Sequence, residues 1–462
     1  MLTSRLLGSA LMMSLSFGSV MAQAQPGNSL AKPLTAPVDV DAPLLGLPET
    51  LIAGLRPLVD SAAEAAPRVI EARLAQLAAQ AREEETRSVT RPRADVFLDL
   101  SYRRNSETSD GGFKPYYNVG VEQPLWHWDA LTNQKRIAVI QKKLAANDYA
   151  EARRALVLEI RRSYLDLILQ KLSLAGAEDA YGRQQTALKV NRDRATRGEY
   201  AADLLATEQL DARKAGIARD RQQSALQRAL RDFAILNGLD SFSVDRLPVA
   251  IGDVPASATA LFQPEAAAPL PASNRIPDAL ARPEGDLEAA RLQQEITRVR
   301  NYPMLNLAAG ADQGATSGTD QTAVINYFAG VRVRWNIFDG FATRAAVKEA
   351  RVTVRKNEKI VADARLALLN QLKDQSDDLS LSLRELAVAE ERFSLTTSRE
   401  KVDDDLRKTG RLAETEWQAR AANAQTERIA LYDLRGRVIL QLSEHALLRQ
   451  RASKPAEDIL FP

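Results

Sequence analysis

The residues that most often carry catalysis or bind metals are scarce and scattered in this chain. It has two histidines, His127 and His445, which lie 318 positions apart, and it has no cysteine. No segment places histidine, carboxylate or thiol groups at the spacing of a metal or nucleophile site, and no phosphate-binding motif occurs. We therefore expect no catalytic residue, no metal and no cofactor. The protein is not expected to be an enzyme, and energy for any process it serves must come from a partner.

Charged residues are numerous and nearly balanced. The chain holds 62 lysines and arginines against 60 aspartates and glutamates, which leaves a formal net charge of +2. This balance argues against a nucleic-acid partner, because nucleic-acid-binding surfaces carry a marked basic excess. The absence of cysteine also excludes disulfides and a lipid-modified N-terminal cysteine. The function must therefore be inferred from the secondary-structure elements of the chain and their arrangement.

The N-terminus has the pattern of a secretory signal. Arg5 precedes an apolar run over residues 6–20, and Ala22-Gln23-Ala24 provides small residues for cleavage. We expect a signal peptide over residues 1–24, cleaved after Ala22 or Ala24; a buried N-terminal helix is the alternative. Prolines recur through residues 25–61, which we expect to be extended. No later run reaches the roughly 18 apolar residues that indicate a transmembrane helix.

The rest of the chain is duplicated. Residues 121–129 align with residues 331–339 at an offset of 210, Pro92 aligns with Pro303 at 211, and Gly198 aligns with Gly410 at 212. A period this long indicates two equivalent halves of one architecture. We expect a first repeat over residues 62–240, a proline- and alanine-rich linker over 241–284, a second repeat over 285–448, and a tail over 449–462.

Each repeat contains a predicted β-hairpin, over residues 94–125 and 304–335. Apolar and polar residues alternate along both, which is the period of a half-buried strand. Arg332 and Arg334 indicate the face that contacts water, because an arginine side chain that faces lipid has a high free-energy cost. Strands of about 9–12 residues suit a tilted membrane strand; a solvent-facing hairpin is the alternative. His127, between two tryptophans, fits an aromatic belt at the membrane surface.

A long helical hairpin follows each β-hairpin, over residues 130–238 and 340–448. Val347, Val354, Val361 and Leu368 keep a seven-residue spacing, and the phase then slips by four to Leu372, Leu379, Leu386 and Phe393. This is the seam of a coiled coil with a local unwinding. Asp129 and Asp339 precede the long helices and suit N-capping. An all-helical scaffold would explain these seams but not the β-hairpins.

Four strands are too few to close a membrane barrel. Open strand edges are not tolerated in lipid, and small barrels begin at about eight strands. If the strands lie in a membrane, several copies must therefore pool them, and three copies would supply twelve. The predicted class is an α+β membrane protein with a shared β-barrel and long coiled-coil hairpins.

On these features the chain resembles the TolC family of outer-membrane channel proteins. The resemblance rests on the duplication, the glycine turns between long helices, Arg282-Pro283-Glu284 at a helix start, and Trp335-Asn336-Ile337-Phe338-Asp339-Gly340 before residues 344–350. It implies a homotrimer in the cell outer membrane, with a twelve-stranded barrel and a periplasmic α-helical tunnel. It also implies docking to a periplasmic adaptor that connects to an inner-membrane pump or ABC transporter. The implied function is the passive exit duct of a tripartite efflux pump or a type I secretion system. The alternative is a soluble periplasmic coiled-coil scaffold.

The resemblance further implies roles for the hairpin tips. The glycine turns would form the adaptor-docking tips, with Arg197, Gly198 and Glu199 in one hairpin and Thr409, Gly410 and Arg411 in the other. A simple turn role for the two glycines is the alternative.

Family members can also carry acidic residues beyond the second glycine, where they narrow the tunnel entrance. Glu416, with Asp203 and Arg407 nearby, is the corresponding candidate constriction in this chain. Solvated helix faces near a tip are the alternative. The run Asp403-Asp404-Asp405 is expected to face solvent.

Overall fold

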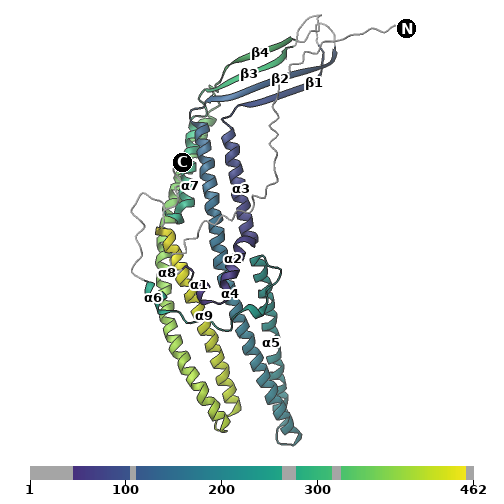
Figure 1. The fold of residues 1–462 in the computed structure, drawn as a ribbon, viewed down its shortest axis with the longest axis vertical. Coiled ribbons are helices and arrows are strands. Elements are labelled where there is room, and N and C mark those ends of the chain that lie inside the picture. Colours follow the sequence, from purple (N-terminus) through teal and green to yellow (C-terminus); the bar gives the residue numbers. More distant parts are fainter. Residues whose placement is uncertain (1–44, 105–110, 263–276, 315–323, 454–462) are drawn as a thin grey trace, which may run out of the picture. The chain divides into compact units, whose positions relative to one another are not determined.

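The same series of elements occurs twice along the chain: a helix, two strands, a long helix and a shorter returning helix. The computed structural model describes residues 45–104, 111–262, 277–314 and 324–453 (Figure 1), all within the second of two units, residues 42–462. The expected signal peptide over 1–24 and residues 454–462 of the tail lie outside the described residues. Within the described chain, none of the helices carries an apolar stretch long enough to span a bilayer.

The first series begins with three helices rather than one. Its elements are α1 (Leu47–Leu51), α2 (Leu55–Ala65), α3 (Pro67–Ser88), β1 (Arg93–Arg104), β2 (Gly111–Trp126), α4 (Ala130–Thr196) and α5 (Ala202–Asn237). The expectation that residues up to 61 are extended is wrong from Leu47 onward. Pro48, Pro57 and Pro67 each lie in the first turn of a helix. Proline is tolerated there because the first turn has no intrahelical use for its N–H.

The second series follows a short irregular segment. That segment contains η1 (Val244–Arg246), α6 (Ala256–Leu261) and η2 (Asp278–Leu280). The series itself consists of α7 (Ala281–Arg298), β3 (Met304–Gly314), β4 (Val324–Arg334), α8 (Ala342–Lys408) and α9 (Glu414–Ser453). Helices α4 and α8 each have 67 residues, about 100 Å at about 1.5 Å per residue. Figure 1 shows α4 paired with α5, and α8 paired with α9.

The four strands form one antiparallel sheet in the order β1-β2-β3-β4. Ala94 faces Val121, Val121 faces Ala309, and Ala309 faces Ala329, so one row of residues crosses all four strands. The register between β2 and β3 shifts at Pro124. A proline cannot donate a ladder hydrogen bond, so a bulge is where it is tolerated.

The helices are held together by coiled-coil seams. Val354, Val361 and Leu368 are buried on α8, and so are Leu372, Leu379 and Leu386 after the four-residue slip. The largest apolar cluster joins α4, α5, α8 and α9 to α1 and α2, and its most deeply buried side chains include Tyr164, Phe233 and Leu379. Helices of this length depend on such packing more than on intrinsic propensity.

Helix α1 ties the two series together through a buried arginine. The Arg161 guanidinium on α4 donates to both carboxylate oxygens of Glu49 at 2.8 and 2.9 Å, and to the Leu45 carbonyl at 2.7 Å. It also donates to the Ser443 hydroxyl on α9 at 3.1 Å. A buried charge is tolerated only when it is paired and hydrogen-bonded, and here one side chain of α4 bonds two other segments, α1 with the preceding Leu45, and α9.

Candidate functional site

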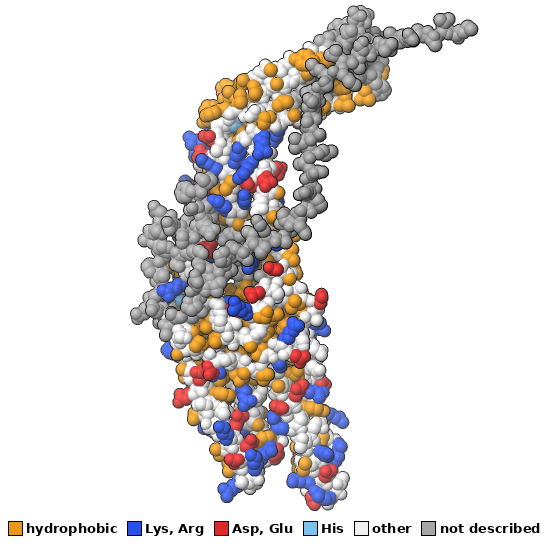
Figure 2. All heavy atoms as spheres, viewed as in Figure 1, with side chains coloured by type: hydrophobic (Ala, Val, Ile, Leu, Met, Phe, Trp, Pro, Cys, Tyr) orange, Lys and Arg blue, Asp and Glu red, His pale blue; other side chains and the backbone are white. Residues whose placement is uncertain are grey.

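The sheet has one apolar face that is exposed in the single chain. Val96 faces Val119, Val119 faces Ala311, and Ala311 faces Tyr327 in one row of this face. The side chain of Tyr327 is 80% exposed and that of Val96 is 77% exposed. Figure 2 shows hydrophobic side chains gathered over the strands. An apolar patch of this extent marks a surface that contacts a membrane or another protein.

The opposite face carries a polar network close to the ends of the strands that join the helices. The Asn306 amide donates to Glu122 at 2.6 Å, and the His127 Nε2 lies 2.7 Å from the Asn306 oxygen. Arg332 lies 3.7 Å from the Glu122 carboxylate. His127 therefore belongs to this polar network, while its neighbour Trp128 donates to the Pro303 carbonyl at 2.8 Å.

Charged residues occupy several rows of the polar face. Arg93, Arg332 and Arg334 lie in the rows closest to the helices, with Glu122 among them. The rows farther from the helices contain Asp95, Asp99 and Asp312. Two faces of such different chemistry fit a sheet that separates a hydrocarbon phase from water.

Both outer strands of the sheet lack a strand partner on one side within the described residues. Strand β1 pairs only with β2, and β4 pairs only with β3. Unpaired edges of this length invite pairing with another chain. The sheet is therefore incomplete as a membrane wall in a single chain.

The first hairpin tip is a glycine-centred turn after α4. Gly198 has a φ of +75° and donates to the Ala195 carbonyl at 3.0 Å, while Glu199 donates to the Arg194 carbonyl at 2.9 Å. These two bonds form a Schellman motif, which satisfies carbonyls at the helix end. Arg197 and Glu199 form an ion pair at 3.3 Å and are both exposed. The turn thus presents one basic and one acidic side chain to solvent.

The second tip repeats this geometry. Gly410 has a φ of +72° and donates to the Arg407 carbonyl at 3.0 Å, and Arg411 donates to the Leu406 carbonyl at 2.9 Å. The Thr409 hydroxyl donates back to the Asp405 carbonyl at 2.9 Å. The polar residues expected at the two tips therefore lie on structurally equivalent turns.

The three constriction candidates are not joined into one cluster. Glu416 accepts a hydrogen bond from Arg420 at 2.6 Å. The Arg407 guanidinium lies 3.9 Å from the centre of the Trp417 ring and 4.0 Å from the Glu414 carboxylate. Asp203 is exposed in the first turn of α5, in the other hairpin.

Sequence reasoning missed the side chains that connect α8 to α9 at the second tip. Arg420 bonds Asp403 and Glu416, both at 2.6 Å, and Trp417 donates to Asp404 at 3.0 Å. The expectation that the run of three aspartates faces solvent is wrong for Asp403, which is buried, whereas Asp404 and Asp405 are exposed. The spacing of four between Glu416 and Arg420 was the available signal, because such pairs meet on a helix surface.

The first tip has a different internal network. The Tyr200 hydroxyl donates to Glu208 at 2.6 Å, and the Asn191 amide donates to the same carboxylate at 2.8 Å. The hydrogen bond to Glu208 raises the pKa of Tyr200. These bonds join the end of α4 to the start of α5.

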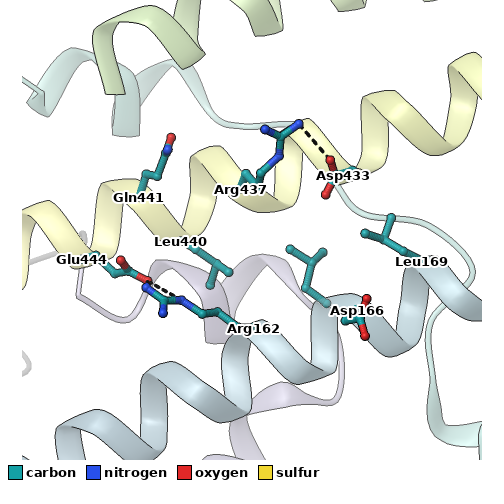
Figure 3. Close-up of a pocket in the computed structure, with 9 residues that line it drawn as sticks. Arg162, Asp166, Leu169, Asp433, Arg437, Leu440, Gln441 and Glu444 are labelled. Carbon is teal, nitrogen blue, oxygen red and sulfur yellow. Dashed lines mark hydrogen bonds and ion pairs between the residues drawn. The ribbon is translucent and has the colours of Figure 1, made fainter. Parts of the chain in front are cut away.

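A shallow groove runs between α4 and α9 near the middle of the hairpins (Figure 3). Arg162 pairs with Glu444 at 2.7 Å across the groove, and Arg437 pairs with Asp433 at 2.8 Å along α9. These charges are already neutralised by one another, so they indicate no ligand. Among the described residues no group of three or more histidines and carboxylates could hold a metal ion.

Comparisons with known proteins agree with this arrangement. Residues 278–444 match the family model described as Outer membrane efflux protein. The chain is 25% identical over 236 residues to Protein CyaE of Bordetella pertussis, a match that covers 50% of this chain and 48% of that protein. The match thus spans about half the length of this curated relative.

Solved structures share the fold over most of the chain. The CmeC outer membrane channel of Campylobacter jejuni superposes with a TM-score of 0.69 at 12% identity, covering 88% of this chain and 87% of that one. The outer membrane protein VceC of Vibrio cholerae gives 0.65 at 14% identity, covering 87% and 97%. The open MtrE outer membrane channel of Neisseria gonorrhoeae gives 0.61 at 13% identity, covering 87% and 90%.

The fold expected from the sequence, four strands and two long helical hairpins per chain, is confirmed. The matching family model covers the second repeat, and the structural matches extend over both repeats. Residues 278–444 therefore belong to the outer membrane efflux protein family, and the chain has the fold of solved outer-membrane channels.

Proposed function

We propose that three copies of this chain form an outer-membrane channel that serves as the passive exit duct of a tripartite efflux pump or a type I secretion system. The observation that carries the proposal is the sheet with one apolar face, one charged face and two unpaired edges. In lipid every backbone polar group must be satisfied. Pairing β4 of one copy with β1 of the next removes both edges, and three copies give a twelve-stranded barrel.

The polar face of the sheet would line the lumen of this barrel. Arg332, Arg334 and Glu122 would then lie in the lumen near the junction with the helices, and the exposed Val96 and Tyr327 would face lipid. The two long hairpins of each copy would continue the passage into the periplasm as a helical tunnel. The chain offers no nucleotide-binding motif, so transport through this passage would be driven by a partner.

The two tips are the proposed docking points for a periplasmic adaptor that leads to an inner-membrane pump or ABC transporter. Arg197, Glu199 and Arg411 are exposed on turns of the same geometry, so an adaptor could contact the two hairpins in equivalent ways. Gly198 and Gly410 would hold these turns, and Thr409 would complete the second one. Adaptor contact would open the passage.

A narrow entrance near Glu416 belongs to the same proposal. Glu416 is exposed but bonded to Arg420, so its charge is partly screened in the single chain. Reversal of this charge, Glu416→Lys, should change the conductance of the reconstituted channel and its block by cations. Arg437→Glu on the groove between α4 and α9 is the control. An unchanged conductance and cation block in Glu416→Lys would exclude Glu416, with Asp203 and Arg407, as the constriction.

A soluble periplasmic coiled-coil scaffold is the competing function. It would use the same helical seams but would leave the apolar face of the sheet in water. Purification of the mature protein discriminates the two. We expect extraction from the outer-membrane fraction only with detergent, a heat-modifiable trimer on gels, and ion conductance in planar bilayers. A water-soluble monomer without conductance would refute the channel.

A further inference from the structure

The two repeats carry different side chains where the strands give way to the long helices. Helices α4 and α8 both have 67 residues, and α8 begins 212 positions after α4. At this offset the charged Asp129 before α4 corresponds to the apolar Phe341 before α8, and the neutral Thr132 corresponds to Arg344. Because both repeats build the same elements, these differences are not required by the fold itself.

Four apolar side chains are exposed in the connection between β4 and α8, residues 335–341. Phe338 is 71% exposed and Phe341 is 66% exposed, and Trp335 and Ile337 are exposed as well. The rings of Phe338 and Phe341 pack edge to face with their centres 5.5 Å apart. The exposed apolar surface of the sheet therefore continues beyond β4 into this connection.

Basic side chains follow on one face of α8. Arg344 and Lys348 come three and seven positions after Phe341, a spacing that places all three residues on the same face of a helix. Two further bases continue this face, so the basic stripe consists of Arg344, Lys348, Arg351 and Arg355. All four are exposed, and within the described part of the chain none of them forms an ion pair.

The nearest acidic residues do not neutralise the basic stripe. Glu349 is the one acid among residues 342–355, and at about 100° per residue it lies about 130° around the helix from the middle of the stripe. On the adjacent α7, Glu288 lies 3.9 Å from Arg291, and Glu295 lies 3.8 Å from Arg298. Each of these two carboxylates already has a cation on its own helix, so the stripe keeps its positive charge.

We infer that this junction binds the anionic headgroups of phospholipids in the membrane leaflet that faces the periplasm. The inference rests on the proposed membrane position of the sheet, and it names the class of lipid that the channel contacts at this level. Trp335 would lie at the boundary between hydrocarbon and headgroups, where tryptophan is enriched. Phe338 and Phe341 would pack against acyl chains, and Arg344 and Lys348 would donate to lipid phosphates.

Positions along α8 place two of the four bases within reach of the headgroups. At about 1.5 Å per residue, Arg344 lies about 3 Å and Lys348 about 9 Å from the first residue of the helix. The headgroup layer of one leaflet is roughly 5–8 Å thick, and the long side chains of arginine and lysine extend toward it. Arg355 lies about 20 Å from the start of the helix and is too far away to contact a headgroup.

The combination of apolar and basic side chains favours a lipid as the occupant. Figure 2 shows lysine and arginine side chains on the uppermost turns of the helices, next to the hydrophobic side chains of the sheet. A free anion would contact the bases alone, whereas an anionic lipid uses both groups, since its phosphate meets the bases and its acyl chains meet the apolar rings. Arginine also pairs with a phosphate through two parallel hydrogen bonds. The order apolar, aromatic, basic along the chain thus matches the layers of a membrane that contains anionic lipids.

Quenching of tryptophan fluorescence by brominated lipids tests the inference. Three of the four tryptophans, Trp126, Trp128 and Trp335, lie where the strands join the helices, and Trp417 lies near a hairpin tip. The full chain is reconstituted into phosphatidylcholine vesicles in which part of the lipid is replaced by brominated phosphatidylglycerol or by brominated phosphatidylcholine. We expect stronger quenching by the anionic lipid, because phosphatidylglycerol is then enriched next to the tryptophans.

The double variant Arg344→Gln with Lys348→Gln should lose most of this preference. A base near an anionic membrane surface strengthens association about fivefold, so two bases correspond to a change in relative lipid affinity of up to about 25-fold. Arg355→Gln with Lys356→Gln is the matched control, because it removes the same two residue types about 20 Å from the start of the helix. In the wild type, about 1 M salt, where the Debye length is about 3 Å, should lower the preference as well.

The outcomes separate this lipid site from the proposed function. Loss of the preference in Arg344→Gln with Lys348→Gln, and its retention in the control, supports the site. Equal quenching of the wild type by the two brominated lipids, or an equal preference in the two double variants, would overturn the site and leave the channel standing. Tryptophans that neither brominated lipid quenches would refute the membrane position of the sheet, and with it both proposals.

A heat-modifiable oligomer of each variant reports that it has folded. Should Arg344→Gln with Lys348→Gln fail to form this oligomer, the salt dependence of the wild type decides. A preference for phosphatidylglycerol that falls in about 1 M salt supports the site, and a preference that persists there would overturn it.

Discussion

Three glycines in this chain have the same left-handed backbone but different surroundings, so alanine should affect them differently. Gly198, Gly410 and Gly238 have φ values of +75°, +72° and +67°. A Cβ on Gly198 or Gly410 meets no atom within 4 Å, whereas a Cβ on Gly238 would lie 2.5 Å from the Ala65 carbonyl oxygen. At the tips only backbone strain opposes a side chain. At Gly238 a backbone oxygen opposes it as well.

The magnitudes follow from these surroundings. A left-handed conformation costs an L-residue about 1–2 kcal/mol, and loss of glycine freedom in the unfolded chain returns about 0.4–1 kcal/mol. Gly198→Ala and Gly410→Ala should therefore weaken their turns by about 0.5–1.5 kcal/mol. In Gly238→Ala the packed backbone at Ala65 must also be displaced, which costs about 1–3 kcal/mol more. The total loss of stability should therefore be about 2–4 kcal/mol. Of the three glycines, Gly238 alone lies against α2, at the Ala65 carbonyl.

Hydrogen exchange measures the tip variants and thermal unfolding measures the third. The amides of Glu199 and Arg411 close the two turns, and a loss of about 0.5–1.5 kcal/mol corresponds to exchange roughly 2- to 12-fold faster. The melting temperature of the whole protein should stay unchanged in the tip variants and fall in Gly238→Ala. Asparagine tolerates the left-handed conformation, so Gly198→Asn is the control and should exchange more slowly than Gly198→Ala.

Two results would refute this reasoning. One is an equal fall in melting temperature for Gly198→Ala and Gly238→Ala, which would mean that the space around the glycine does not matter. The other is exchange at Glu199 that is no slower in Gly198→Asn than in Gly198→Ala, which would mean that backbone strain is not the cause.

Three further predictions concern buried and lumenal charges. Arg161→Ala leaves the Glu49 carboxylate without its cation and should destabilise the protein by about 3–5 kcal/mol. The control Arg162→Ala removes an exposed arginine and should destabilise it by at most about 1 kcal/mol. Circular dichroism melting curves of the two variants that coincide would contradict this. Burial, and then the positive charge of Arg449, lower the pKa of His445 below its usual 6.5. The unfolded chain therefore binds a proton more readily than the folded protein, and the free energy of unfolding should fall as the pH drops below about 6.5. His445→Gln should flatten that part of the stability curve, and an unchanged slope would show that another group titrates there. Arg332→Gln removes one lumenal cation per subunit and should shift the reversal potential in a salt gradient toward cation preference; no shift would remove this residue from the lumen.

The elements that the sequence predicts correctly are those whose pattern repeats many times. The hairpin strands alternate over several residues, and the seam from Val354 to Leu386 includes its four-residue slip. Pro48 and Pro57 misled because proline both starts helices and breaks them. The burial of Asp403 could not be predicted either, since it depends on where Arg420 meets α8 across the turn. The division into domains and the roles of the tips stay predictions.

The structure also changes the alignment of the repeats where the strands give way to the long helices. The sequence aligns Asp129 with Asp339, at an offset of 210. In the structure two consecutive left-handed residues precede each helix, Trp128 and Asp129 before α4 and Gly340 and Phe341 before α8, an offset of 212. Three residues, 127–129, separate β2 from α4, whereas seven residues, 335–341, separate β4 from α8.

This shift explains why only one of the two expected caps forms. Asp339 lies two residues before Phe341, and its carboxylate accepts from the Thr343 N–H at 2.8 Å. Hydrogen bonding by the Thr343 side chain, and then by its backbone N–H, lowers the pKa of Asp339. Asp129 occupies the turn itself, and its side chain makes no cap bond. The first junction is instead held by the Trp128 bond to the Pro303 carbonyl, in the second repeat. The junction before α8 is thus capped by its own aspartate, whereas the junction before α4 is held by the second repeat.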